Sequence, residues 1–237
     1  MSLRFASRWY WWLATAVAVP LFISLGFWQW HRGDHRREVW DAFASTDVPA
    51  VEATASSLAR LPRYTRVQIN GELDATRQFL LENISHAGAP GYEVLTVAAL
   101  ADGSRLLVNR GWVPFSGLRE QLPDVAFATT GPMPLTGRLG TLPVAGLASG
   151  QVAPVASAPW PRVASFPSFE QLELAYGARL ESVVLLLDAA SGPGYLRDWQ
   201  APGVSPERNF GYAIQWWSFA LLAICLFIGL NLKKRNA

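Results

Sequence analysis

The chain has 237 residues, 51 % of them apolar, a formal net charge of +2 and one cysteine, Cys225. Between residues 31 and 208 there are 15 arginines, no lysine and 18 acidic residues, so this region carries a net charge near −3. The balance gives no support to nucleic-acid binding, and a lone cysteine excludes a disulfide framework and a paired-thiol redox or copper-transfer site.

The first apolar run extends from Trp9 to Trp30, 22 residues without a charged side chain, and follows Arg4 and Arg8. A cleaved signal peptide is the competing interpretation, since Ala16-Val17-Ala18 fits the small-x-small cleavage pattern. The apolar run continues well beyond that point, which favours a retained transmembrane anchor, with residues 1–8 in the cytoplasm.

The middle region, residues 31–208, has mainly the period-two alternation of β-strands. We predict strands at 66–73, 78–84, 92–100, 105–113, 134–139 and 182–187, a helix at 169–176 that ends at Gly177, and a long loop at 140–161. Asp102-Gly103 predicts a hairpin turn between two of these strands.

The second apolar run, 209–232, is 24 residues long and would extend roughly 36 Å as a helix, enough to cross a hydrocarbon core of about 30 Å. Lys233-Lys234-Arg235 follows and predicts a cytoplasmic tail, residues 233–237. The sequence thus predicts an α+β membrane protein. Two transmembrane helices flank a mostly antiparallel, barrel-like β-domain outside the cytoplasm, with one or two short helices.

The start of the second span carries more than lipid-facing residues. Asn209, Tyr212, Trp216 and Phe219 fall on one helical stripe, and Gln215 lies beside it. One interpretation is an aromatic belt at headgroup depth, with Gln215 reaching water. The other is a docking face for another helix or for a flat cofactor, because a glutamine inside a span needs a partner.

Two further groups of residues have chemistry to offer. His31 and His35 are spaced i, i+4, which suits a metal or haem iron but also a solvated helix flank. Asn109-Arg110-Gly111-Trp112 has two interpretations. Either Trp112 belongs to the core and Arg110 pairs with a surface carboxylate, or both residues meet a partner or a haem propionate. Motifs for a nucleophile, phosphate loop or catalytic zinc are absent, so we expect no enzymatic activity.

Four motifs in this order resemble the Surfeit locus protein 1 family. They are Leu25–Arg32, with Trp28, Gln29 and Arg32; Tyr64–Gly71; Leu107–Pro114; and Gly194–Trp199, followed by Pro206–Trp216. The resemblance implies a factor for the assembly of haem-copper cytochrome c oxidase, in the bacterial inner membrane with a periplasmic domain. It further implies haem a as cofactor and the oxidase catalytic subunit as partner, alongside the lipid bilayer.

The resemblance also implies the site residues. Cofactor contacts are expected at Asn209, Tyr212, Gln215, Trp216 and His31, and partner contacts at Trp28, Gln29, Arg32, Arg110 and Trp112. Asn209 stands where the family commonly has a histidine, and an amide is a poor iron ligand. An assembly factor that assists haem a delivery and a stable accessory subunit that braces an oxidase therefore both remain open.

Overall fold

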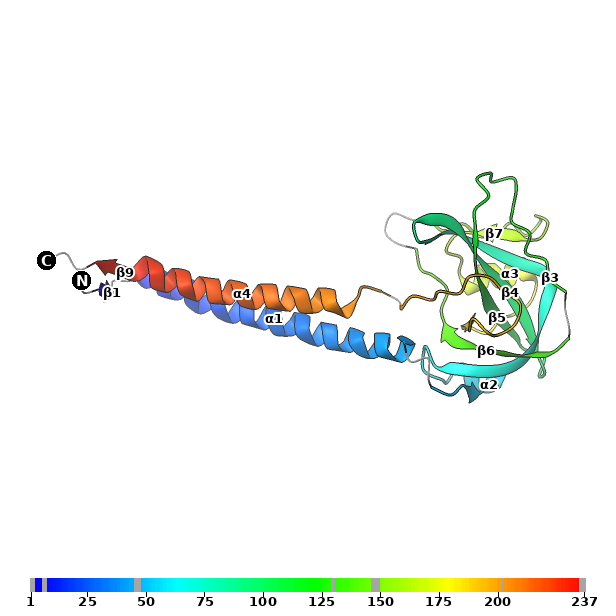
Figure 1. Cartoon of the computed structure of the whole chain (residues 1–237), viewed down its shortest axis with the longest axis horizontal. Coiled ribbons are helices and arrows are strands. Elements are labelled where there is room, and N and C mark those ends of the chain that lie inside the picture. The colour runs from blue at the N-terminus through cyan, green and yellow to red at the C-terminus, as the bar shows by residue number, and fades with distance from the viewer. Residues whose placement is uncertain are drawn as a thin grey trace. The chain divides into compact units, whose positions relative to one another are not determined.

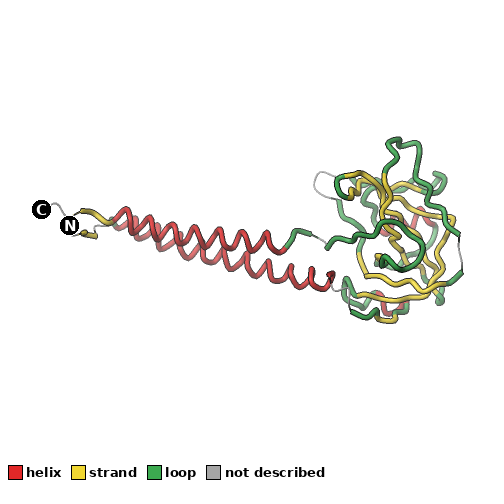
Figure 2. Tube along the Cα trace, in the orientation of Figure 1, coloured by secondary structure: helices red, strands yellow, loops and turns green. Residues whose placement is uncertain are grey.

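The computed structural model describes residues 3–5, 8–44, 48–128, 131–145, 150–201 and 203–234. These residues form two compact units, one made of residues 1–45 and 201–237 and the other of residues 46–200. Figure 1 shows two long helices side by side in the first unit, and Figure 2 shows that strands dominate the second.

The helical unit contains α1 (Trp9–Ala44) and α4 (Pro206–Asn231), and a short antiparallel pairing of β1 (Leu3–Phe5) with β9 (Leu232–Lys234). Both helices are long and apolar enough to cross a membrane. The predicted span 9–30 lies within α1, and the predicted span 209–232 ends one residue past α4. Helix α1 continues to Ala44 because the charged residues after Trp30 end an apolar run without ending a helix. Of the predicted terminal segments 1–8 and 233–237, residues 1, 2, 6, 7 and 235–237 lie outside the described residues.

The β unit is built on a mixed seven-stranded sheet. Its elements are β2 (Val51–Glu52), α2 (Ala55–Leu58), β3 (Arg66–His86), β4 (Ala89–Leu100), β5 (Arg105–Pro114), β6 (Met133–Gly140), β7 (Arg162–Ala164), α3 (Phe169–Tyr176) and β8 (Val184–Leu187). The strands predicted at 66–73 and 78–84 form the single strand β3, whose register shifts between Leu73 and Gln78.

The strand pairings form a closed circuit. β3, β4, β5, β8 and β6 are neighbours in that order, and β6 pairs back onto the first part of β3. The long strands pair antiparallel, whereas β2 and β7 join β3, and β8 joins β5, in parallel. The shift in the middle of β3 lets its first part face β6 and its second part face β4 and β7, as bulges allow a strand to bend.

The strands place apolar side chains on both faces of the sheet. One core cluster, including Val67, Leu106 and Leu135, lies between the strands of the circuit, and a second, including Phe79 and Leu172, lies beneath α3. Helix α3 confirms the prediction at 169–176: the Ser168 side chain caps its first turn, and Gly177 ends it with a left-handed φ of 84°.

A polar network ties β3 to α3. The Tyr176 hydroxyl and the Arg77 Nε donate to the same oxygen of Asp74, at 2.8 and 2.7 Å. Burial raises the pKa of Asp74, but hydrogen bonds from Thr76, Tyr176 and Arg77 outweigh it and lower this pKa to about 2. Burial and the bond to Asp74 raise the pKa of Tyr176 to about 12. The network is therefore stable across the neutral range.

Candidate functional site

Helices α1 and α4 pack through two glycines and two large aromatic side chains, each pair spaced by seven residues. A Cβ atom at Gly26 would lie 2.1 Å from Nε1 of Trp217, and one at Gly33 would lie 2.6 Å from the Phe210 ring. Only glycine leaves room for these rings, so each ring of α4 packs directly on the α1 backbone at its level. A seven-residue repeat keeps the same faces together along two helices.

A hydrogen bond between side-chain amides joins the helices between the two glycine levels. Nδ2 of Asn209 donates to Oε1 of Gln29 over 2.8 Å, and Asn209 is only 7 % exposed. An amide pair that is partly buried between apolar helices fixes their register, because a shifted pairing would leave both groups without a partner. The structure thus directs Asn209 into the helix pair rather than toward an open cofactor face.

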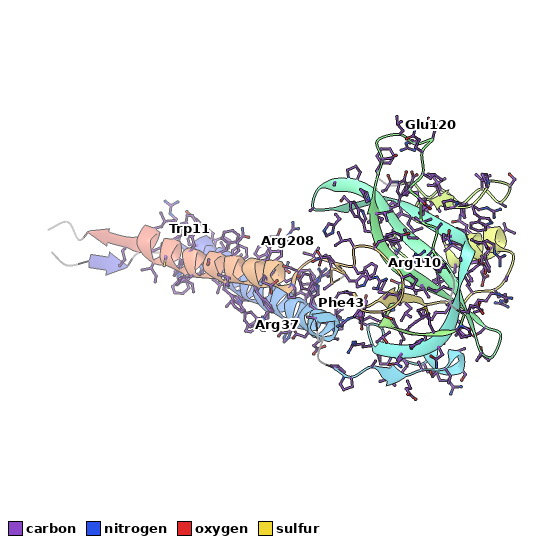
Figure 3. The ribbon with its side chains drawn as sticks, turned by 45° about the vertical axis from the view of Figure 1, so that its right-hand side comes forward. Trp11, Arg37, Phe43, Arg110, Glu120 and Arg208 are labelled. Atoms are coloured by element: carbon purple, nitrogen blue, oxygen red, sulfur yellow. The ribbon has the colours of Figure 1, made fainter. Side chains whose placement is uncertain are left out.

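Trp30 completes this level of the interface. Its ring lies 4.9 Å from that of Phe210 and 5.7 Å from that of Trp217, measured between centroids, and is stacked on the latter at 29°. The Arg37 guanidinium lies over the Phe210 ring, 4.4 Å from its centroid. Arg37 and Phe43 are among the labelled side chains of α1 in Figure 3.

The predicted aromatic stripe of α4 divides between two faces. Trp216 stacks on Phe22 of α1 with a centroid distance of 5.8 Å, and Phe219 meets the same ring edge to face. Tyr212 and Gln215 are exposed and point away from the α1 interface, with the Arg208 guanidinium 5.9 Å from the Tyr212 ring centroid. Asn209, Tyr212, Gln215 and Trp216 therefore do not converge on one pocket.

His31, Trp28 and Arg32 lie on the exposed side of α1. The Arg32 guanidinium lies 5.5 Å from the Trp28 ring centroid, one helical turn away. His31 is only two positions from Gln29, but that spacing places the two side chains about 200° apart around a helix. The structure does not bring the His31 imidazole to Asn209.

Arg110, in the β unit, is buried rather than presented at a surface. It is 1 % exposed, its Nε donates to the Pro193 carbonyl at 3.1 Å and its Nη1 to the Val125 carbonyl at 3.3 Å. The rings of Phe127 and Tyr195 flank the guanidinium at 4.0 and 5.1 Å. Burial lowers the pKa of Arg110. This position stands against a direct partner contact, and no carboxylate of the described residues pairs with Arg110; Figure 3 shows it among the strands.

Trp112 is partly buried at the other end of this motif. Its indole N–H donates to the Ile84 carbonyl at 3.3 Å, and its ring packs beside Gly91, where a Cβ would come within 2.4 Å of the indole. The His86 ring lies 5.5 Å away. Arg110 and Trp112 thus both pack within the domain. A partner contact remains a prediction only for the exposed part of the Trp112 side chain.

Sequence reasoning missed the residues that build the interface: Gly26, Trp30, Gly33, Phe210 and Trp217. A signal was present, since Gly26 and Gly33 repeat at the same seven-residue spacing as Phe210 and Trp217. The spacing within each helix does not reveal which residue on the other helix is opposite, so the pairing needed the tertiary structure.

Fold and site together define a class of protein: two long apolar helices, held together by an amide pair and close glycine–aromatic packing, flank one mixed β-domain. The family model described as "SURF1 family" matches residues 16–221, and the chain belongs to this family. It is also 33 % identical over 100 residues to a SURF1-like protein of Dictyostelium discoideum. That match covers 38 % of this chain and 37 % of the relative, so the chain spans well under half of that relative's length.

Proposed function

We propose that this protein is a membrane-bound assembly factor for a haem-copper cytochrome c oxidase that acts by binding the oxidase catalytic subunit, without catalysis of its own. Proteins of the SURF1 family are known as cytochrome oxidase assembly factors. The exposure of four residues indicates where the partner would bind. Side chains already fill the contact between α1 and α4, whereas Trp28 with Arg32 and Tyr212 with Gln215 remain exposed on the outer faces of the helix pair.

These outward residues suit a protein partner better than lipid. The side-chain amide of Gln215 lies within a span whose other residues are mostly apolar, and no described residue hydrogen-bonds to it. A polar group at that depth gains free energy from a hydrogen-bonding partner on another helix. The exposed tryptophan and tyrosine add large, rigid contact area of the kind that dominates protein interfaces.

In this proposal the helices cross the bacterial inner membrane at residues 9–30 and 209–232, the barrel-like domain is periplasmic, and both termini are cytoplasmic. The basic residues after the second span support this orientation. Protease added to spheroplasts should digest the β-domain and leave a tag after Ala237 intact. Loss of the tag with a protected domain would reverse the topology.

Haem a is the cofactor that the family implies, and the residues at the mouth of the second span do not fit it. The Asn209 amide donates to Gln29 inside the helix pair, and Tyr212 and Gln215 point elsewhere. We therefore propose no haem ligation by Asn209. His31 and His35 are both exposed on α1, but Nδ1 of His35 lies 3.6 Å from the Glu38 carboxylate, so we propose His31 as the residue that assists haem a delivery or insertion.

The accessory-subunit alternative is favoured by the amide at position 209, which offers haem no imidazole and is already bonded to Gln29. A helix pair that lacks this imidazole suits a permanent structural element better than a haem carrier. The two differ in residence: a subunit stays with mature oxidase in stoichiometric amount, whereas an assembly factor is released.

The test is co-purification of the tagged full-length protein from membranes, with quantification of the oxidase catalytic subunit and of haem. Gln215→Leu and Trp28→Ala should each lower the recovered catalytic subunit severalfold, while Leu221→Ala, an exposed apolar position, should not. His31→Ala should lower haem retention, with His35→Ala as the matched control. Unchanged recovery in both outward variants would refute the docking faces, and stoichiometric retention in mature oxidase would favour the subunit.

A further inference from the structure

A small hollow in the β unit has lining residues that are short of partners. It is lined by β3, β4 and the segment that follows β5, and has a volume of about 170 Å³. The rings of Tyr92 and Phe115 meet edge to face with centroids 6.0 Å apart, and the backbone N–H of Phe115 donates to the Pro90 carbonyl at 3.0 Å. These contacts fix the aromatic part of the wall, so the hollow is formed before anything binds.

Glu82 supplies the charge of this hollow. Its side chain is 19 % exposed, and no described residue donates a hydrogen bond to its carboxylate. The nearest cation is Arg119, whose Nη1 lies 3.6 Å from Oε2 of Glu82, beyond normal hydrogen-bond length, and whose side chain is 77 % exposed. A carboxylate largely withdrawn from water usually has a closer donor.

The Tyr92 hydroxyl is the second group without a partner. Tyr92 is 4 % exposed and lines the hollow, and no described residue hydrogen-bonds with its hydroxyl. Burial raises the pKa of this hydroxyl, the charge of Glu82 adds to the increase, and that of Arg119 opposes it. The hydroxyl is therefore protonated at neutral pH and stands near both charged groups, as an available acceptor and donor.

We propose that this hollow is a binding site for a basic side chain, lysine or arginine, of a partner protein, with Glu82 as its counter-ion and Arg119 as a resident competitor. A carboxylate beside aromatic rings is the combination that recognises an ammonium or guanidinium group. An acidic ligand would be repelled by the charge of Glu82, and an apolar one would leave that carboxylate without a donor. The volume accommodates one long side chain rather than a larger cofactor.

The site is independent of the oxidase role, and it is tested with the full-length protein in detergent. Binding of N-acetyl-arginine methylamide is followed by saturation-transfer NMR, with N-acetyl-norleucine methylamide as the uncharged probe. Glu82→Gln should weaken binding of the arginine probe at least fivefold. Arg119→Ala should strengthen it at least twofold, because the competing cation is removed.

Glu120→Gln is the matched control, because Glu120 is an exposed acid next to Arg119 on the same segment (Figure 3) and should leave binding unchanged. Equal losses in the Glu82 and Glu120 variants would reduce the effect to general charge and overturn the proposal. Weaker binding by Arg119→Ala, or equal binding of the two probes, would do the same. Since Arg119 is exposed, that variant gives a result even if Glu82→Gln does not fold.

Discussion

The hydrogen bond between Gln29 and Asn209 should contribute about 1 kcal/mol to the association of α1 with α4. Double-mutant cycles on hydrogen bonds between membrane helices average about 0.6 kcal/mol and reach about 1.7. The 2.8 Å length and the 7 % exposure of Asn209 favour the upper half of that range. The coupling corresponds to a factor of about five in the equilibrium between associated and separated helices.

The coupling is obtained from Gln29→Ala, Asn209→Ala and the double variant, because each single change also leaves the other amide without its partner. The cycle removes that contribution, so the coupling measures the pair itself. Each single variant alone should lose more than the coupling energy, since an unsatisfied buried amide costs about 1–3 kcal/mol.

The assay is titration of the full-length protein in mild-detergent micelles with SDS, read by pyrene excimer fluorescence. Labels on Cys225 and on Leu13→Cys report helix separation, because these exposed positions lie near the contact between Trp12 and Phe227, whose ring centroids are 4.8 Å apart. Ser24→Ala is the control: its hydroxyl donates to a carbonyl of its own helix, so the titration midpoint should not move.

A coupling below about 0.3 kcal/mol, with both single variants matching the Ser24→Ala control, would refute a stabilising role for this hydrogen bond. The amides would then not fix the register of the pair, and the glycine–aromatic and aromatic–aromatic contacts would hold the helices together.

Three further predictions test other parts of the structure. Gly26→Leu should lower the same SDS midpoint by the equivalent of at least about 2 kcal/mol, since the new side chain collides with the indole packed there. Asp74 has a folded-state pKa of about 2, below its ordinary 3.8, so the stability that its ionised form contributes is present above pH 4 and is lost as pH falls toward 2. After allowance for partial exposure, this contribution to the free energy of unfolding is about 1 kcal/mol. Asp74→Asn should abolish this part of the pH dependence in thermal melts. Trp112→Ala should destabilise the β unit by about 3 kcal/mol, measured by denaturant unfolding, and an unchanged midpoint would make it a surface residue.

Much of the architecture follows from local properties of the sequence. Length and hydropathy predict both apolar helices, Asp102-Gly103 predicts the hairpin between β4 and β5, and Ser168 with Gly177 delimits α3. These features depend on residues a few positions apart, where turn chemistry, capping and apolar periodicity act directly on the backbone.

Other features depend on residues far apart in the chain, and only the tertiary structure decided them. The short strands β2 and β7 exist because β3 offers them free backbone edges, and no local pattern specifies such a partner. Arg110 lies in a motif that the sequence suggests is exposed, yet carbonyl groups and rings from distant loops enclose its guanidinium.

The same reason applies to the site. The sequence by itself determined that α4 begins with a polar and aromatic stripe, and that Asn209 offers an amide in place of an imidazole. It did not determine the direction in which that amide points. The direction follows from the register of α1 against α4, which brings together Gln29 and Asn209, 180 positions apart in the chain. Two glycines that admit two aromatic rings set this register, together with the hydrogen bond that Gln29 accepts from Asn209.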